Sequence, residues 1–269
     1  MTTLRLVALI SFLAVVAFVP VAHGQLLLST NDNKVTLVNG VATVVKSPPP
    51  DTLTVIDLKA WPPKVVAELD VPGSVVGPPF SVAVSPDESL ALVTANEKLD
   101  PADPTKRVPN NTMSIVDLKA APPRIIATLE TGKAPAGVSI NRAGTLALVA
   151  NRGEGTVSVY TIQGKTVAPA GKVTIADDKS GTSHAAISPD GKLALVTRDG
   201  DDRISVLSID GTKWNTRSVI SPRASGPTGS TSPRTAPSRP SPTSAGAAAT
   251  LTPSASSISR RSRRASSAP

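Results

Sequence analysis

The chain has 269 residues, a formal net charge of +8 and no cysteine, which excludes a disulfide framework and any cysteine-based metal site. Only 2% of the residues are aromatic, so the stacking platforms that bind single-stranded nucleic acid are missing. The charge excess belongs to residues 219–269, which carry seven arginines and no acid, whereas residues 25–218 carry 20 basic and 20 acidic residues. We therefore expect no nucleic-acid partner.

The first 24 residues have the pattern of a secretory signal peptide. Arg5 supplies the positive charge, Leu6–Val19 supplies the apolar run, and Ala22 and Gly24 are small residues before a cut at Gln25. The apolar run is short for a membrane span, although an uncleaved anchor is the alternative. We expect a bacterial protein that is periplasmic or secreted, with no stable membrane span after cleavage.

A repeated strand motif organises the chain from residue 25 to residue 218. Val55–Leu58 and Ile115–Leu118 are each followed by Lys-Ala, one variable residue and Pro-Pro. Later copies of the strand are Val159–Ile162 and Val206–Ile209. The successive steps are 60, 44 and 47 residues, and the first contains a 14-residue insertion, Glu97–Asn110. Several short strands per period of about 45 residues are typical of β-propeller blades.

Other strands and turns recur within the same period. Each expected blade has an inner strand, a tight turn containing Pro, Asp or Gly, a second strand, a loop, a third strand and an outer strand. The expected inner strands are Val82–Val84, Val138–Ile140 and Ala185–Ile187; the turns are Ser85–Glu88, Asn141–Gly144 and Ser188–Gly191; the second strands are Leu90–Asn96, Leu146–Asn151 and Leu193–Arg198; two outer strands are Val65–Leu69 and Ile125–Leu129.

An earlier partial blade precedes these. Leu26–Thr30 and Leu53–Leu58 are its expected strands, with residues 31–52 inserted between them. The predicted fold class is all-β: an incomplete β-propeller of four-stranded antiparallel blades. A β-sandwich of unrelated strands is the alternative, which the regular period disfavours.

The segments LVTAN, LVAN, SPDG and TVSVYTI resemble the repeats of bacterial YVTN-type β-propeller proteins, a WD40-like repeat class. Those proteins are related to the seven-bladed, lactonase-like propellers. The resemblance covers residues 25–213. It implies the propeller fold and, as one option, a lactonase-like hydrolase activity, although propellers host many functions.

Residues 219–269 differ sharply from the rest, being rich in Ser, Pro, Ala, Thr and Arg. Such a segment buries too little apolar surface to offset its ordering entropy, so we expect a disordered tail. A natural basic linker is one explanation. The other is a frameshift near Ser218, because codons for Ser225–Thr243 and Ala249–Ser259, shifted in phase, can encode further propeller-like strands. The chain would then be truncated, and we expect self-association through its open propeller edge.

Ligand-binding candidates lie where the largest insertions gather. The connections between second and third strands, and those between an outer strand and the next blade, fall at one end of the blades. His184, the one histidine of residues 25–269, begins an inner strand near that end. Asn96, Asn151 and Arg198 end the second strands there. The alternatives are a polar rim histidine, asparagines that bond loop backbone, and a charged turn or cation site at Arg198–Asp202.

The sequence contains no P-loop, dinucleotide fingerprint, HExxH or GxSxG motif. We therefore assign no catalytic residue, no metal and no cofactor. The expected function is an exported scaffold that binds an unknown protein or small-molecule ligand through its loops. A lactonase-like hydrolase and a truncated product without function are the alternatives.

Overall fold

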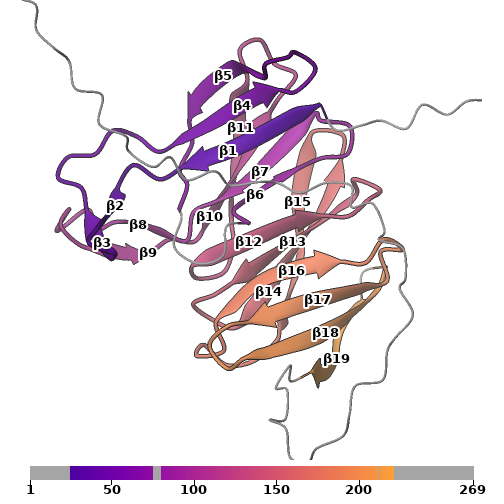
Figure 1. Cartoon of the computed structure of the whole chain (residues 1–269). Helices are drawn as coiled ribbons and strands as arrows, with labels where there is room; N and C mark the ends of the chain where they lie inside the picture. Colours follow the sequence, from indigo (N-terminus) through magenta and orange to yellow (C-terminus); the bar gives the residue numbers. More distant parts are fainter. Residues whose placement is uncertain (1–24, 75–79, 212, 221–269) are drawn as a thin grey trace, which may run out of the picture.

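The computed structural model describes residues 25–74, 80–211 and 213–220, and every regular element in this part is a β-strand. The expected signal peptide and nearly all of the expected tail lie outside the described residues. Antiparallel sheets succeed one another in chain order, as the colour gradient of Figure 1 shows. The predicted all-β fold, an incomplete propeller of antiparallel blades, is confirmed.

Four sheets form the blades, which we number 1 to 4. Blade 1 has three strands, β1 (Leu26–Asn31), β4 (Thr52–Asp57) and β5 (Lys64–Asp70). Blade 2 contains β6 (Val82–Val84), β7 (Leu90–Thr94), β10 (Thr112–Asp117) and β11 (Arg124–Glu130). Blade 3 contains β12 (Pro135–Ile140), β13 (Leu146–Asn151), β14 (Thr156–Gln163) and β15 (Thr166–Thr174). Blade 4 contains β16 (Thr182–Ile187), β17 (Leu193–Arg198), β18 (Arg203–Asp210) and β19 (Lys213–Ile220).

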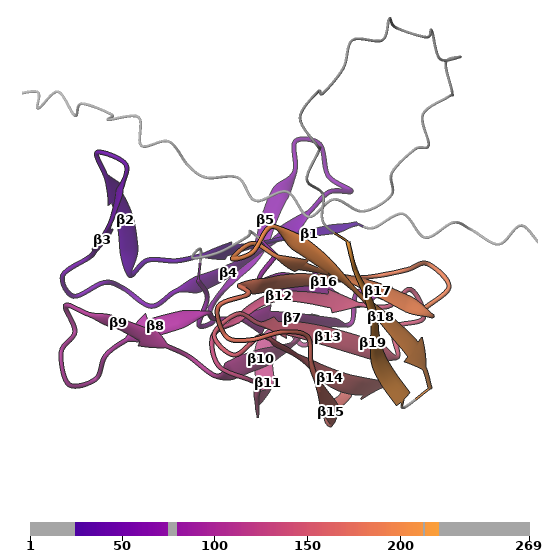
Figure 2. The ribbon, with the colours of Figure 1, turned by 90° about the horizontal axis from the view of Figure 1, so that it is seen from below.

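Both insertions fold into two-stranded hairpins, which the sequence patterns did not predict. One is β2 (Val35–Val38) with β3 (Val41–Val44), and the other is β8 (Glu97–Leu99) with β9 (Arg107–Pro109). Both project from the same end of the blades, away from the stack of sheets (Figure 2). The insertions therefore enlarge one end of the propeller only.

The tight turns between first and second strands are fixed by short polar side chains. In blade 2 the Ser85 hydroxyl donates to Asp87 Oδ1 over 2.6 Å and accepts the backbone N–H of Leu90 over 2.9 Å. Ser188 and Asp190 repeat this arrangement in blade 4. These hydroxyls hold the pKa values of Asp87 and Asp190 below the ordinary range, because they stabilise the charged carboxylates. The repeated motif is therefore structural.

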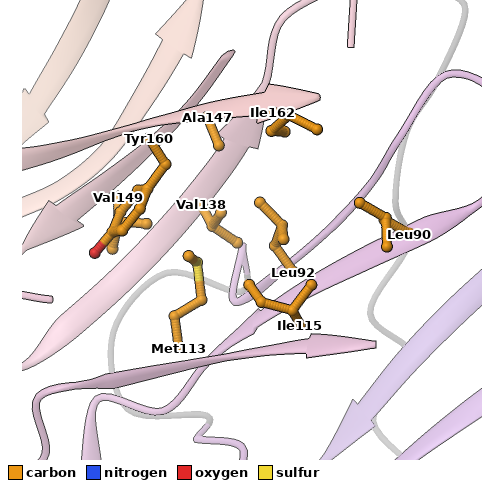
Figure 3. Packing of buried hydrophobic residues seen from close by; sticks show 9 residues of the cluster. All are labelled: Leu90, Leu92, Met113, Ile115, Val138, Ala147, Val149, Tyr160 and Ile162. Carbon is orange, nitrogen blue, oxygen red and sulfur yellow. The ribbon is translucent and has the colours of Figure 1, made fainter. Parts of the chain in front are cut away.

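The hydrophobic core lies between successive blades. Each blade presents one sheet face, its N-side face, to the preceding blade and the other, its C-side face, to the following blade. The interface of blades 2 and 3 is the cluster in Figure 3, where Leu90, Leu92, Met113 and Ile115 of blade 2 meet Val138, Ala147, Val149, Tyr160 and Ile162 of blade 3. Equivalent clusters join blades 1 and 2 and blades 3 and 4. The alternation of the strands thus buries both faces of the inner blades.

No helix long and apolar enough to cross a membrane occurs within the described ranges.

Candidate functional site

Both hairpins project from one end of the blades, and we call the connections at this end the loop face. It comprises residues 32–51, 71–74, 95–111, 131–134, 152–155, 175–181 and 199–202. Neighbouring connections hydrogen-bond to each other there. The backbone N–H of Gly132 donates to Asn151 Oδ1 over 3.0 Å, and that of Gly200 donates to the carbonyl of Ser180 over 3.0 Å. The two sets of loops expected to share one end of the propeller are therefore brought together.

His184 lies on the innermost strand of blade 4, β16, close to the loop face. Its ring stacks on Phe80, which lies just before β6 of blade 2; the centroids are 4.6 Å apart and the planes differ by 27°. Gly137 of blade 3 runs beside this pair: a Cβ on Gly137 would lie 2.4 Å from His184 Nδ1. The first strands of three blades thus meet around one imidazole.

The Nδ1 atom of His184 is buried and has no hydrogen-bond partner. Burial also lowers the pKa of His184 below its ordinary value of about 6.5, because the charged imidazolium loses solvation. The imidazole is therefore neutral at neutral pH, and Nε2 is the nitrogen left to meet a ligand. A neutral imidazole is able to accept a proton, which suits general-base chemistry.

A charged pair lies next to this histidine. Arg152, on the loop between β13 and β14, donates from Nη1 to the Ser183 hydroxyl over 2.9 Å and to Asp199 Oδ2 over 2.5 Å. Both side chains of the ion pair are partly exposed. Arg152 thus links blade 3 to blade 4 one residue away from His184, and sequence reasoning did not single it out.

Every side-chain hydrogen bond of Asn151 goes to a neighbouring residue of the protein, on β14 or in the 131–134 connection. Its Nδ2 donates to the hydroxyls of Thr156 and Ser158 over 2.8 and 2.9 Å, while its Oδ1 accepts the Gly132 N–H. The side chain is fully buried. Asn151 therefore ties its own blade to the connection between blades 2 and 3.

Asn31 of blade 1 holds the same position as Asn151, donating to Thr52 and Thr54 hydroxyls over 3.0 Å each. Asn96 does not hold this position, because the segment from Leu90 to Asn96 is one residue longer than the segment from Leu146 to Asn151. Asn96 instead donates from Nδ2 to the carbonyl of Ala134 over 3.0 Å. The match between Asn31 and Asn151 is visible in the sequence only once the strand register is known.

Arg198 holds the equivalent position in blade 4. Its Nη1 donates to the Ser205 hydroxyl over 3.2 Å and its Nη2 to Asp201, while Nε is buried without a partner. Asp199 is engaged by Arg152. Two of the three carboxylates of this turn thus pair with arginines. Within the described ranges, no group of three or more His, Asp or Glu side chains is placed to hold a metal ion.

A buried lysine lies at the base of the β2–β3 hairpin and was not anticipated. Lys34 Nζ contacts Asp32 over 3.1 Å, Asp51 over 2.7 Å and the carbonyl of Gly73, and its side chain is 7% exposed. Both carboxylates are also nearly buried. This cluster fixes the two ends of the 32–51 connection to each other and to the connection after β5.

Two hollows open on the loop face around the hairpins. One of about 210 Å³ lies between Lys34 and Asn110, and one of about 630 Å³ lies between β3 and the β8–β9 loop at Pro104. A third, of about 960 Å³, lies at the opposite end between blades 3 and 4 near Asp190 and Asp210. His184 lines none of these three. The four predicted ligand-binding residues stay a prediction.

Residues 79–234 match the family described as "Lactonase, 7-bladed beta-propeller", which is more than half of the chain. The match continues past β19 into the expected tail, for which the frameshift hypothesis stays a prediction. A search of curated proteins finds no match.

Three solved structures are similar to this chain. A Bacteroides uniformis protein assigned as a 6-phosphogluconolactonase is 16% identical with a TM-score of 0.48, covering 63% of this chain and 51% of that chain. A Bacteroides fragilis protein with the same assignment is 14% identical with a TM-score of 0.48, covering 76% and 70%. Kuenenia stuttgartiensis hydrazine synthase is 24% identical with a TM-score of 0.45, covering 63% and 43%.

The chain spans about half the length of the first of these structures. Four successive blades built from one repeat agree with the match over residues 79–234. The chain therefore belongs to the family of seven-bladed β-propeller lactonases.

Proposed function

We propose that this chain forms part of a propeller that hydrolyses lactones, with His184 as the general base. Membership of the lactonase family supports the reaction class. The observation that carries the site is the His184 imidazole, which burial keeps neutral and which is held by Phe80 and Gly137 near the loop face. A neutral imidazole of this kind is able to take the proton of an attacking water molecule, which is one way to catalyse lactone hydrolysis.

The reaction follows from that placement. His184 Nε2 takes a proton from a water molecule while the water oxygen adds to the carbonyl carbon of the lactone. The ring C–O bond of the tetrahedral intermediate then breaks, and the departing alkoxide takes the proton from the imidazolium. The product is a hydroxy acid, and the imidazole returns to its neutral form.

Arg152 supplies a cation at this site, since it donates to the hydroxyl of Ser183, the residue before His184. Its guanidinium is anchored by Ser183 and Asp199, so its position is fixed before a ligand arrives. A fixed positive charge stabilises the oxyanion that forms on the carbonyl oxygen during hydrolysis. We therefore propose that Arg152 favours substrates and intermediates that carry negative charge.

The test is the release of acid from glucono-δ-lactone and δ-valerolactone, measured at constant pH with the full chain. We expect hydrolysis above the spontaneous rate, and a loss in kcat/KM of about 10²- to 10⁴-fold in His184→Gln. The matched control is Arg142→Gln, an exposed residue in a turn at the opposite end of blade 3, which leaves the rate unchanged. No hydrolysis by the parent chain, or equal rates in His184→Gln, would contradict the proposal.

A binding role is the second candidate, and the β2–β3 hairpin favours it. Leu37 and Val41 near its tip are 73% and 65% exposed. Exposed apolar side chains on a projecting hairpin are typical of a surface that contacts a partner. Leu37→Lys would then abolish capture of that partner and leave lactone hydrolysis intact. We also propose export, which signal-peptide cleavage before Gln25 in a bacterial host would test.

A further inference from the structure

The stack of blades ends in two faces that no described residue covers. They are the C-side face of blade 4 and the N-side face of blade 1. In Figure 1 these two sheets lie at opposite ends of the stack. Every other blade face is buried against a neighbouring blade.

The open face of blade 4 has the composition of a buried interface. Leu193 and Leu195 on β17 occupy the positions that Leu90 and Leu92 hold in blade 2 and Leu146 and Leu148 hold in blade 3. Those four side chains are at most 9% exposed, whereas Leu193 and Leu195 are 38% and 46% exposed. Ile204 and Val206 on β18 correspond in the same way to the buried Val157 and Val159. This face is therefore a blade interface that lacks its partner.

The open face of blade 1 has the composition of the opposite half of such an interface. Ile56 and Leu58 occupy the positions of Val116 and Leu118, which cover the C-side face of blade 1. Val116 and Leu118 are 0% and 8% exposed, whereas Leu58 is 43% exposed and Ile56 is partly exposed. Leu27 lies opposite Ile56 on β1 and widens the same face. Each chain thus has one free C-side face and one free N-side face. These are the two kinds of face that pack together at its three internal blade interfaces.

Residues 221–269 do not have the composition to cover either face. Each N-side face of blades 2 to 4 supplies several large apolar side chains to its interface. Leu251 and Ile258 are the only Val, Leu, Ile, Met or aromatic residues among these 49 residues. Burying two leucines and two β-branched residues needs a larger apolar surface than this segment provides.

We propose that the C-side face of blade 4 packs on the N-side face of blade 1 of a second copy of this chain, and that the reciprocal contact closes a two-fold ring. Four blades from each copy give eight, one more than in the seven-bladed family that the chain matches and within the usual propeller range of about 4–8 blades. Such contacts are heterologous, and they end in a closed ring when the rotation per copy allows it. The assembly does not depend on the proposed hydrolysis.

The test is the sedimenting mass of the full chain and of two variants that place a charge in one face each. We expect a dimer for the parent chain, and half that mass for both Leu195→Lys and Ile56→Lys. An equimolar mixture of the two variants should recover the dimer mass, because the mixture still contains one intact pair of faces. Leu37→Lys, on the projecting hairpin, is the matched control and should stay dimeric.

Each other outcome overturns the proposal. A parent chain that sediments as a monomer at all concentrations contradicts the contact itself, and open polymers of increasing mass contradict ring closure. A dimer that survives Ile56→Lys but not Leu195→Lys indicates that two C-side faces pack together. Circular dichroism of both variants confirms that the blades remain folded, which separates loss of assembly from loss of structure.

Discussion

The rings of Phe80 and His184 stack although they come from blades 2 and 4, which are separated by the whole of blade 3. Gly137 of blade 3 lies beside the His184 ring, and its lack of a side chain leaves room for that ring. The backbone reinforces the arrangement, since the Val138 N–H donates to the Phe80 carbonyl over 2.9 Å. The orientation of the imidazole therefore depends on the stacking of three consecutive blades.

Gly137→Ala tests this dependence. The new methyl group would lie 2.4 Å from His184 Nδ1 and 2.7 Å from the Ser183 carbonyl, so the imidazole or β16 must move. We expect a loss of about 1–3 kcal/mol in the free energy of unfolding, as for other overpacked sites. Urea denaturation measures it. Gly73→Ala is the control, because its nearest neighbour would be 3.7 Å away; equal effects of the two variants would contradict the account of Gly137.

The lowered pKa of His184 predicts a pH dependence of stability. The unfolded chain binds a proton at this histidine near its ordinary pKa of about 6.5, whereas the folded chain binds it only at lower pH. The contribution of neutral His184 to the free energy of unfolding is therefore fully present above pH 6.5. It is lost as the pH falls towards the pKa of His184 in the folded chain. Thermal melting of the parent chain and of His184→Gln across this range measures it. Parallel curves for the two proteins would show that His184 has no part in the effect.

Asn151 and Asn96 should contribute differently to stability, since Asn151 ends β13 whereas Asn96 lies two residues beyond the end of β7. Asn151→Ala removes three hydrogen bonds and leaves the buried Gly132 N–H without an acceptor. We expect the free energy of unfolding to fall by about 1–3 kcal/mol in Asn151→Ala. In Asn96→Ala, which removes one hydrogen bond, it should fall by only about 1 kcal/mol. Chemical denaturation ranks the two. The reverse order would refute the structural role given to Asn151.

Lys34→Met should be among the more destabilising single substitutions in blade 1. It removes the cation from between Asp32 and Asp51 and leaves two nearly buried carboxylates facing each other. Breaking a buried ion pair in this way costs about 3–5 kcal/mol. The control is Lys106→Met, whose exposed pair with Asp103 is worth about 0–1 kcal/mol. If Lys34→Met lowered the free energy of unfolding by less than Lys106→Met does, the buried cluster would have no stabilising role.

The repeat allowed most of the blade architecture to be predicted, because each strand recurs with the same alternation at the same spacing. Asp117 illustrates this: it lies in the recurring Ile115–Leu118 segment, and its Oδ1 accepts the backbone N–H groups of Lys119 and Ala120 at the end of the strand. The β2–β3 hairpin occurs once and so had no second copy to reveal it. Its signal was Asn39-Gly40, where both residues adopt the positive φ angles of a type I′ turn.

The candidate site was harder to predict than the blades. His184 was singled out because it is the one histidine after residue 24, yet its partner Phe80 lies 104 residues earlier in the chain. Their contact depends on how much each blade rotates relative to the next, which no local pattern encodes. The Lys34 cluster was missed for a related reason, since its two carboxylates lie at opposite ends of the 32–51 connection and the Gly73 carbonyl comes from another connection.

The most direct measurement is an NMR titration of the His184 ring protons in the full chain, assigned by their loss in His184→Gln and repeated with glucono-δ-lactone. The buried, stacked imidazole predicts a titration midpoint below the ordinary 6.5 and a shift of the ring signals when the lactone is added. A midpoint at or above 6.5, with ring signals that do not respond to the lactone, would contradict both the environment and the role assigned to His184.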